Sequence, residues 1–237
     1  MEIISYLVYL IASVCFIFGI KKLSSPKTGR QGNQLAAIGM LLAIIVTLLD
    51  HRIVTFEYII LGIVIGSLIG AVFALKVQMT GMPQMVGLLN GFGGGASALV
   101  AFAEYDRLFT TTAPFDIPTT ITIILSILIG AVTFTGSLIA FGKLQGIVTG
   151  KVVKYPLQHP LNALLLVGVL VGGIIVVINP YDIELVLAIV GVSLLLGVLL
   201  VLPIGGADMP VAISLLNSYS GLAASMTGFV LNNNMLI

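Results

Sequence analysis

Two asparagines, Asn90 and Asn217, stand inside apolar segments and are the polar residues there that could best do chemistry. Each lies seven residues after a proline and begins the pattern Asn-x-aromatic-x-Gly. An amide donates and accepts hydrogen bonds, so it can bind water or another side chain, but it does not titrate. Because an unpaired buried amide costs several kcal/mol, each asparagine is expected to contact another helix or water.

Both asparagines belong to an internal repeat with an offset of 127 residues, 217 minus 90. The segment GMPQMVGLLNGFGGGASALVAF at 81–102 aligns with DMPVAISLLNSYSGLAASMTGF at 208–229. Proline is tolerated at a helix start, and seven residues of helix then place each amide about 10 Å into a bilayer. One interpretation is hydrogen bonding between helices, worth about 0.6 kcal/mol per contact. The small residues beside both amides favour the other, a water-lined path.

The composition requires lipid around the elements that hold these amides. Of 237 residues, 59% are hydrophobic and 8% are charged, whereas an average soluble domain has about 25% charged residues. So few charges cannot cover a core, and the outer surface itself must be apolar. A water-soluble protein is thereby excluded. The one cysteine, Cys15, excludes a disulfide within the chain.

The sequence predicts an all-α, polytopic transmembrane helix bundle with eight spans, forming one transmembrane domain over residues 1–237. Helices are required because an open strand in lipid would leave backbone groups unpaired. The predicted spans are 3–20, 35–49, 56–75, 82–103, 119–142, 161–178, 183–203 and 209–231. The fourth and eighth spans carry the repeat and run in the same direction, which makes it a parallel repeat.

The basic residues predict the sidedness of these spans. If the loops alternate, one side receives eight of the ten: Lys21, Lys22, Lys27, Arg30, Lys76, Lys143, Lys151 and Lys154. The other side receives only Arg52 and Arg107. Because cytoplasmic loops carry the excess of Lys and Arg, the larger group is expected in the cytoplasm and the N-terminus outside. Eight of the nine acids then lie outside, and Asp208 is the exception.

The central parts of the eight predicted spans contain no Asp, Glu, Lys, Arg or His. Intramembrane ionisable residues usually mark proton or ion relays, so a pump built from this chain alone would lack a titratable group inside the membrane. Either water conducts past Asn90 and Asn217, or another subunit supplies the group. His51 and His159 are expected in polar loops. No catalytic, cofactor-binding or metal-ligating set is predicted in the chain.

Four segments resemble the β subunit of proton-translocating nicotinamide nucleotide transhydrogenase. They are TGRQGNQ at 28–34, MPQMVGLLNGF at 82–92, IGAVTFTGSLIAFGKLQG at 129–146 and IGGADMPVAISLLNSYSG at 204–221. The resemblance implies that the chain is the membrane part of an enzyme that couples hydride transfer from NADH to NADP⁺ to proton passage into the cytoplasm. It also implies that this fragment has no hydride-transfer site, because NAD(H) and NADP(H) bind to soluble domains of the complex.

The resemblance also implies roles for four positions. Asn217 matches a family asparagine of the proton path, and Ser137 matches a polar position facing that path, although a helical serine often bonds its own backbone. Asp208 matches an aspartate at the cytoplasmic mouth that couples to the nucleotide domain, and a helix-capping role fits equally well. Many members have histidine where this chain has Asn90. The hypothesis is that a helix of the partner α subunit supplies the missing protonatable group beside Asn90 and Asn217.

The partners implied are the lipid bilayer, the transhydrogenase α subunit with its membrane helices and NAD(H)-binding domain, a C-terminal NADP(H)-binding domain of the same subunit, and a second protomer. Nucleic acid is not among them, and the membrane implied is the bacterial cytoplasmic one. The eighth span would end outside, so a ninth helix beginning at Met235 is expected to be missing. The alternatives are a secondary transporter or channel without redox coupling, and a purely structural membrane subunit.

Overall fold

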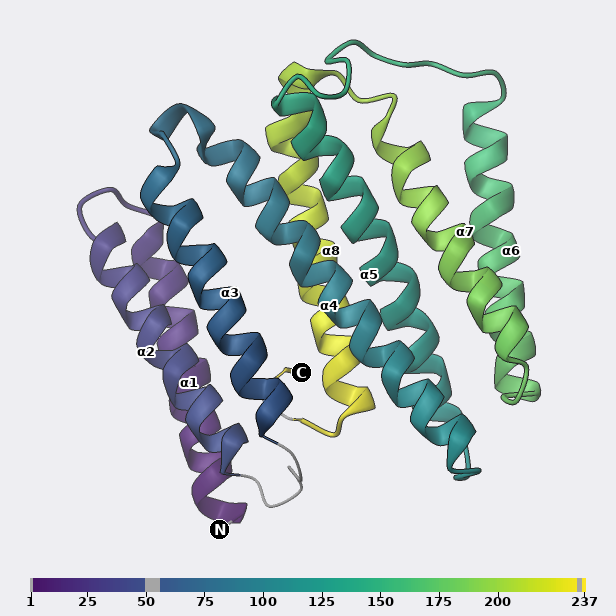
Figure 1. The fold of residues 1–237 in the computed structure, drawn as a ribbon, viewed down its shortest axis with the longest axis horizontal. Coiled ribbons are helices and arrows are strands. Elements are labelled where there is room, and N and C mark those ends of the chain that lie inside the picture. The colour runs from purple at the N-terminus through teal and green to yellow at the C-terminus, as the bar shows by residue number, and fades with distance from the viewer. Residues whose placement is uncertain (1, 50–55, 234–235) are drawn as a thin grey trace. The chain divides into compact units, whose positions relative to one another are not determined.

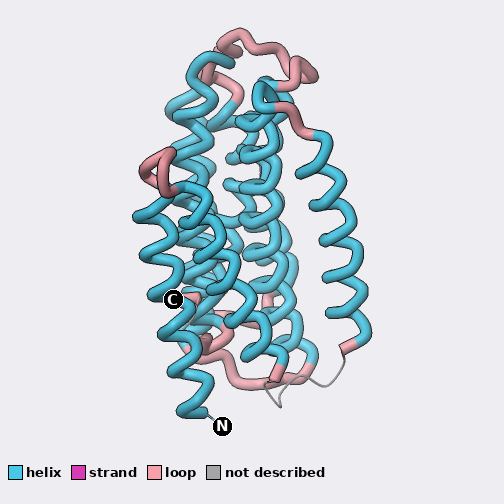
Figure 2. Tube along the Cα trace, turned by 90° about the vertical axis from the view of Figure 1, so that its left-hand side faces the viewer, coloured by secondary structure: helices cyan, strands magenta, loops and turns pink. Residues whose placement is uncertain are grey.

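The computed structural model describes residues 2–49, 56–233 and 236–237, and every regular element in these ranges is helical. The eight long helices are α1 Glu2–Leu23, α2 Gly29–Leu48, α3 Glu57–Lys76, α4 Met82–Thr110, α5 Ile117–Leu144, α6 Gln158–Ile178, α7 Ile183–Val201 and α8 Met209–Val230. Short 3-10 turns, η1 Met79–Gly81 and η2 Gly206–Asp208, precede α4 and α8. Figure 2 shows the helices joined by loops. The predicted all-α class is confirmed.

Seven of the eight described helices are long and apolar enough to cross a membrane. The exception is α8, because an asparagine and several hydroxyl side chains interrupt its apolar residues. The helix count therefore agrees with the prediction, and the count of strongly apolar spans is one lower. Met235, where the ninth helix was expected to begin, lies outside the described residues, as do His51 and Arg52, and Leu236 is not helical.

The chain divides into two compact units, residues 1–75 and 76–237. In the first unit, α1 and α2 form an antiparallel hairpin (Figure 1). A Cβ on Gly32 would lie 2.6 Å from the Gly19 carbonyl oxygen, so glycine is what allows these helices to meet. Near the other end of the hairpin, Tyr9 and Thr47 share a hydrogen bond of 2.9 Å. The helix α2 begins at Gly29, six residues before the predicted 35–49 segment, and ends at Leu48, one residue before the end of that segment.

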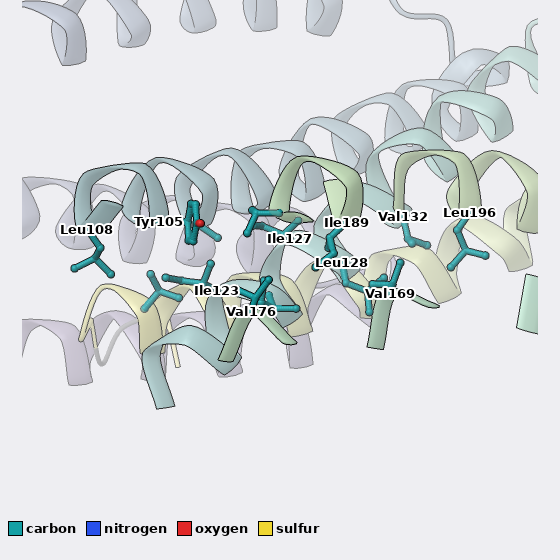
Figure 3. Packing of buried hydrophobic residues seen from close by; sticks show 14 residues of the cluster. Tyr105, Leu108, Ile123, Ile127, Leu128, Val132, Val169, Val176, Ile189 and Leu196 are labelled. Atoms are coloured by element: carbon teal, nitrogen blue, oxygen red, sulfur yellow. The ribbon is translucent and has the colours of Figure 1, made fainter. Parts of the chain in front are cut away.

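The second unit is built around α5, which packs against α4, α6, α7 and α8. Fifteen of its 28 residues are buried. The main apolar cluster joins α5 to α4, α6, α7 and the last residue of α8, with Tyr105, Ile123 and Val176 fully buried (Figure 3). Its neighbours thus enclose about half of α5, and the enclosed residues include several with hydroxyl side chains.

Within the second unit, α4, α6 and α8 run one way and α5 and α7 the other (Figure 1). The end where α5 finishes and α8 begins carries Lys143, Lys151 and Lys154 and is called the lysine end. The opposite end carries Asp116, Asp182 and Glu184 and is called the carboxylate end. The parallel direction of α4 and α8 agrees with the predicted parallel repeat.

Side-chain caps explain where two helices begin at the carboxylate end. Asp116 accepts a hydrogen bond from the Thr119 amide at 3.2 Å, and Asp182 accepts one from the Leu185 amide at 3.0 Å. Each carboxylate thus satisfies an otherwise unpaired donor of the first helical turn. The bond from Thr119 also holds the pKa of Asp116 below its ordinary value.

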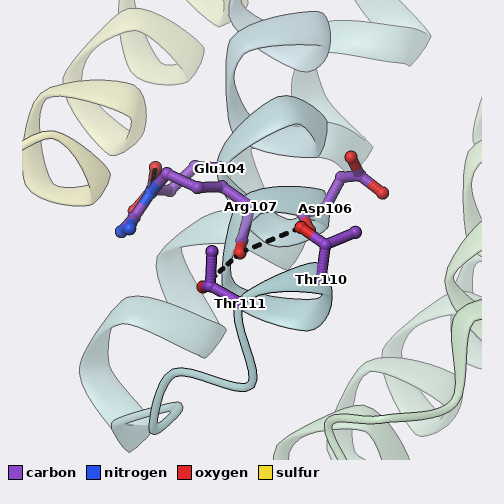
Figure 4. A network of polar contacts seen from close by, with 5 residues as sticks. All are labelled: Glu104, Asp106, Arg107, Thr110 and Thr111. Atoms are coloured by element: carbon purple, nitrogen blue, oxygen red, sulfur yellow. Dashed lines mark hydrogen bonds and ion pairs between the residues drawn. The ribbon is translucent and has the colours of Figure 1, made fainter.

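At the same end, α4 continues seven residues beyond its predicted limit at 103. Arg107 donates two hydrogen bonds to Glu104, at 2.8 and 2.6 Å, one helical turn apart. The hydroxyl of Thr110 donates to the Asp106 carbonyl at 2.8 Å, and that of Thr111 to the Arg107 carbonyl at 2.6 Å (Figure 4). Charged residues therefore sit on the last turns of a helix rather than in a loop.

Candidate functional site

Asn90 lies at the junction of three helices of the second unit. It is 8% exposed, and its Nδ2 donates a hydrogen bond of 2.9 Å to Ser137 Oγ on α5. Its Oδ1 accepts a hydrogen bond of 2.7 Å from Ser220 Oγ on α8. Ser137 is fully buried. These three residues, the Asn90 site, give the amide a partner on each side.

The glycines of α4 make this contact possible. A Cβ on Gly91 would lie 3.2 Å from Ser137 Cβ, and one on Gly94 would lie 2.8 Å from Thr133 Cβ. On α5, a Cβ on Gly130 would lie 2.6 Å from the Gly94 carbonyl oxygen. Such spacing of small residues lets two helix backbones approach closely in a membrane. A side chain as short as serine can then reach the amide of the neighbouring helix.

A second polar cluster joins the same three helices nearer the carboxylate end. Ser126 Oγ on α5 and Thr227 Oγ1 on α8 share a hydrogen bond of 2.8 Å, and both lie within hydrogen-bond distance of the Ser97 carbonyl oxygen on α4. All three side chains are buried. Ser126 precedes Ser137 by eleven residues, about 16 Å along α5.

Thr133 stands between the two clusters on the same face of α5. It lies seven residues after Ser126 and four before Ser137, spacings that share one helix face. Its Oγ1 is buried and, in the described part of the chain, has no hydrogen-bond partner. The face of α5 toward α4 and α8 thus presents hydroxyl groups at three successive depths.

The structure does not bring Asn217 to the Asn90 site. Asn217 is exposed on α8, and no described residue forms a hydrogen bond with its side chain. The reason is the rotation of α8, which turns Leu216 and Ser220 toward the neighbouring helices. Consecutive helical residues point about 100° apart, so Asn217 faces outward. The expectation that both amides are buried is met by Asn90 alone.

Asp208 ends η2 and stands at the start of α8, at the lysine end. Its side chain is exposed and makes no capping hydrogen bond. A negative charge there still interacts favourably with the positive end of the helix dipole. Ahead of it, the Gly206 amide donates to the Gly150 carbonyl at 2.8 Å, which ties the segment before α8 to the loop after α5.

Sequence reasoning missed Ser220 and Lys143. Ser220 replaces Gly93 of the first repeat copy, so the alignment of the two copies gave no sign of it. Lys143 was expected in a polar loop, yet it lies in the last turn of α5 and is 4% exposed. A lysine near a helix C-terminus commonly bonds the last carbonyls of its own helix, whereas Lys143 bonds carbonyls of other segments, so this signal does not predict its burial.

A cavity of about 560 Å³ lies between α4, α5 and α7. It is lined by Phe92, Gly95, Ala96, Ala98, Leu99, Phe102, Ile127, Ala131, Phe134, Leu187, Val190 and Leu194. None of these side chains can hydrogen-bond, and a buried water needs two to four polar partners. The cavity is therefore unsuited to hold a chain of water. Among the described residues, no group of three or more His, Cys, Asp or Glu could hold a metal ion.

Almost the whole chain is similar in sequence to known proteins. The family model for the NAD(P) transhydrogenase beta subunit matches residues 5–237. Two curated proteins described as NAD(P) transhydrogenase subunit beta, from Rhodospirillum rubrum and from one strain of that species, are each 41% identical over 233 residues. The match covers 97% of this chain and 50% of each relative, so the chain spans about half their length. The chain belongs to the NAD(P) transhydrogenase beta subunit family.

Proposed function

We propose that this chain is the proton-translocating membrane part of a transhydrogenase that transfers hydride from NADH to NADP⁺ as a proton enters the cytoplasm. Family membership supports the assignment of the reaction. The Asn90 site is the single observation that supports a role of this chain in proton translocation. One elementary charge crossing 100 mV releases about 2.3 kcal/mol. That energy shifts the equilibrium constant of a hydride exchange between two cofactors of nearly equal energy about 50-fold.

The Asn90 site has the chemistry of a relay step. Ser220 donates to the amide oxygen of Asn90 and the amide nitrogen donates to Ser137, so the hydrogen bonds run in one direction from α8 to α5. Their reversal requires the Asn90 amide to turn by about 180°, because its nitrogen only donates and its oxygen only accepts. None of them holds a proton as a charged group near neutral pH. A complete path therefore needs water or a titratable side chain next to this site.

We place that titratable group on a membrane helix of the α subunit. Asn217 supports this placement, because its amide is exposed on α8 and unused by the described residues. Asn217 precedes Ser220 by three residues on α8, so the two are neighbours on the helix surface. A helix packed against Asn217 would therefore bring its own side chain within reach of Asn217 and close to Ser220 of the Asn90 site. Asp208, exposed at the lysine end, would face the NADP(H)-binding domain and couple its state to α8.

The remaining parts of the proposal concern the complex. NAD(H) and NADP(H) would bind soluble domains, the first on the α subunit and the second on the C-terminal part of this subunit. Two protomers would assemble in the bacterial cytoplasmic membrane, with the lysine end inside and the N-terminus outside. The excess of basic residues at the lysine end supports this orientation.

Reconstitution of the complete complex in proteoliposomes tests the proposal. Proton uptake and hydride transfer are measured together for Ser137→Ala and Asn90→Leu, and for variants of each intramembrane histidine or carboxylate of the α subunit. Loss of proton uptake in the Asn90-site variants and in at least one α-subunit variant is expected. Wild-type proton uptake in all of them would refute the path, and solute uptake by this subunit alone would favour a transporter.

A further inference from the structure

Lys143 is a buried cation that bonds only to backbone carbonyls. Its Nζ donates to the carbonyl oxygens of Leu202 at 2.6 Å, Ile204 at 2.8 Å and Lys151 at 3.2 Å. An ammonium group has three N–H donors and no acceptor, so these three bonds use its full capacity. Within the described residues no carboxylate pairs with it. Such a residue stabilises the position of its acceptors rather than a partner charge.

The acceptors come from two segments that meet only at the lysine end. Lys151 belongs to the loop after α5, whereas Leu202 and Ile204 belong to the connector 202–208 between α7 and α8. Two backbone bonds join the same segments: the Gly206 amide donates to Gly150 at 2.8 Å, and the Val153 amide to Leu202 at 3.4 Å. The lysine therefore fastens both segments to the end of α5.

The connector sets the position of α8. It leads directly to Met209, which is fully buried and packs with Ala140, Val201 and Leu216. Ser220 lies eleven residues further, about 16 Å along the helix. A slide of α8 by two residues, about 3 Å, would lengthen its 2.7 Å bond to Asn90 to about 4 Å if that bond lies across the helix axis, which is beyond hydrogen-bonding distance.

We propose that Lys143 is a positioning residue that holds the connector 202–208 against α5 and thereby keeps Ser220 in register with Asn90. The side chain would act through α8 and would not itself carry the proton. The effect of Lys143 on proton coupling rests on the proposed function, whereas its effect on the position of the connector does not. Hydrogen–deuterium exchange measures the second effect, and proton translocation measures the first.

The test compares Lys143→Met with Lys154→Met in the complete α and β complex. Lys154 lies in the same loop, and its side chain is exposed. Hydrogen–deuterium exchange of peptides covering 148–154 and 202–207 is expected to be on the order of tenfold faster in Lys143→Met, because local opening becomes easier without the charged hydrogen bonds. Lys154→Met is expected to exchange like wild type. In proteoliposomes, Lys143→Met should translocate several-fold fewer protons per hydride.

Chemical rescue keeps the proposal testable if Lys143→Met does not assemble. Lys143→Ala, produced and measured with n-propylammonium, regains an ammonium group of matching length, and slow exchange should return. Tetramethylammonium, which has no N–H donor, should not restore it. Wild-type exchange in Lys143→Met, or in Lys143→Ala without the amine, would overturn the proposal. Faster exchange in Lys143→Met, combined with unaltered proton uptake in the Asn90-site variants, would support Lys143 as the residue that holds the connector and would refute the proposed proton path.

Discussion

Asn90 and Asn217 occupy the same position of the internal repeat, yet Asn90 is buried and bonded to two helices, whereas Asn217 is exposed. The difference extends along both helices. Gly94 lies against α5, while at its counterpart Gly221 no described atom beyond the adjoining backbone of α8 lies within 4 Å of where a Cβ would stand. The two copies therefore use the same small-residue face differently.

This difference predicts opposite effects of one substitution. Gly94→Ala places a Cβ 2.8 Å from Thr133 Cβ and 3.0 Å from the Gly130 carbonyl oxygen, and overpacking of this kind costs about 1–3 kcal/mol. Gly221→Ala should be neutral or slightly stabilising, because alanine favours helix over glycine. Thermal unfolding of the detergent-solubilised subunit measures both. Equal effects would mean that the two glycines have the same surroundings.

The Asn90 site predicts a loss of stability as well as of coupling. Ser137→Ala leaves the buried Nδ2 of Asn90 without its acceptor, which costs about 1–3 kcal/mol. Ser218→Ala is the matched control, since Ser218 is exposed on α8 and bonds only to its own helix at Ser214. Unfolding midpoints of the two variants give the comparison. A control variant as unstable as Ser137→Ala would contradict the assignment.

Asp116 predicts a small pH dependence of stability at the carboxylate end. The hydrogen bond from Thr119 lowers the pKa of Asp116 in the folded state, so its contribution is complete above the unfolded pKa of about 3.9. It is lost as pH falls through the lower folded pKa. Asp116→Ala should cost about 1 kcal/mol at neutral pH. Asp116→Asn caps without titrating, so stability measured from pH 6 down to 3 should fall less steeply than in wild type.

The ring and the hydroxyl of Tyr105 are expected to make separate contributions to the free energy of unfolding. Its ring is fully buried, and its hydroxyl donates to the Pro180 carbonyl at 2.9 Å. Tyr105→Phe should lose about 1 kcal/mol, whereas removal of the ring in Tyr105→Ala should cost about 3–5 kcal/mol. Tyr181→Phe is a control, because that exposed hydroxyl makes a long contact of 3.4 Å to Ala113. Chemical unfolding of the three variants decides the order.

Hydropathy and helix-start signals predicted the existence and direction of the helices well. The proline before each asparagine correctly indicated where α4 and α8 begin, and the parallel repeat gave their common direction. Helix ends were predicted less well, as at α4, because charged residues were assumed to leave the helix. Paired side chains such as Glu104 and Arg107 instead remain within it.

The candidate site was predicted only in part. Asn90 and Ser137 could be chosen because they are polar residues within apolar runs, and they are in contact. The repeat gave no information about the rotation of α8 around its own axis, which depends on packing against α5. For that reason Ser220 was missed and Asn217 was expected inside. The burial of Lys143 depends on three carbonyls, two of which are 59 and 61 residues away, and no local pattern encodes these two contacts.

The central position of α5 has a consequence for how far this sequence can vary. Because α5 contacts four other helices, a larger side chain at one position disturbs several interfaces at once. None of the described residues of α3, by comparison, is buried. Saturation mutagenesis would therefore accept few replacements along α5, mostly of equal volume, and many apolar ones along α3. Substitutions that attach labels or stabilise the subunit are therefore best made outside α5.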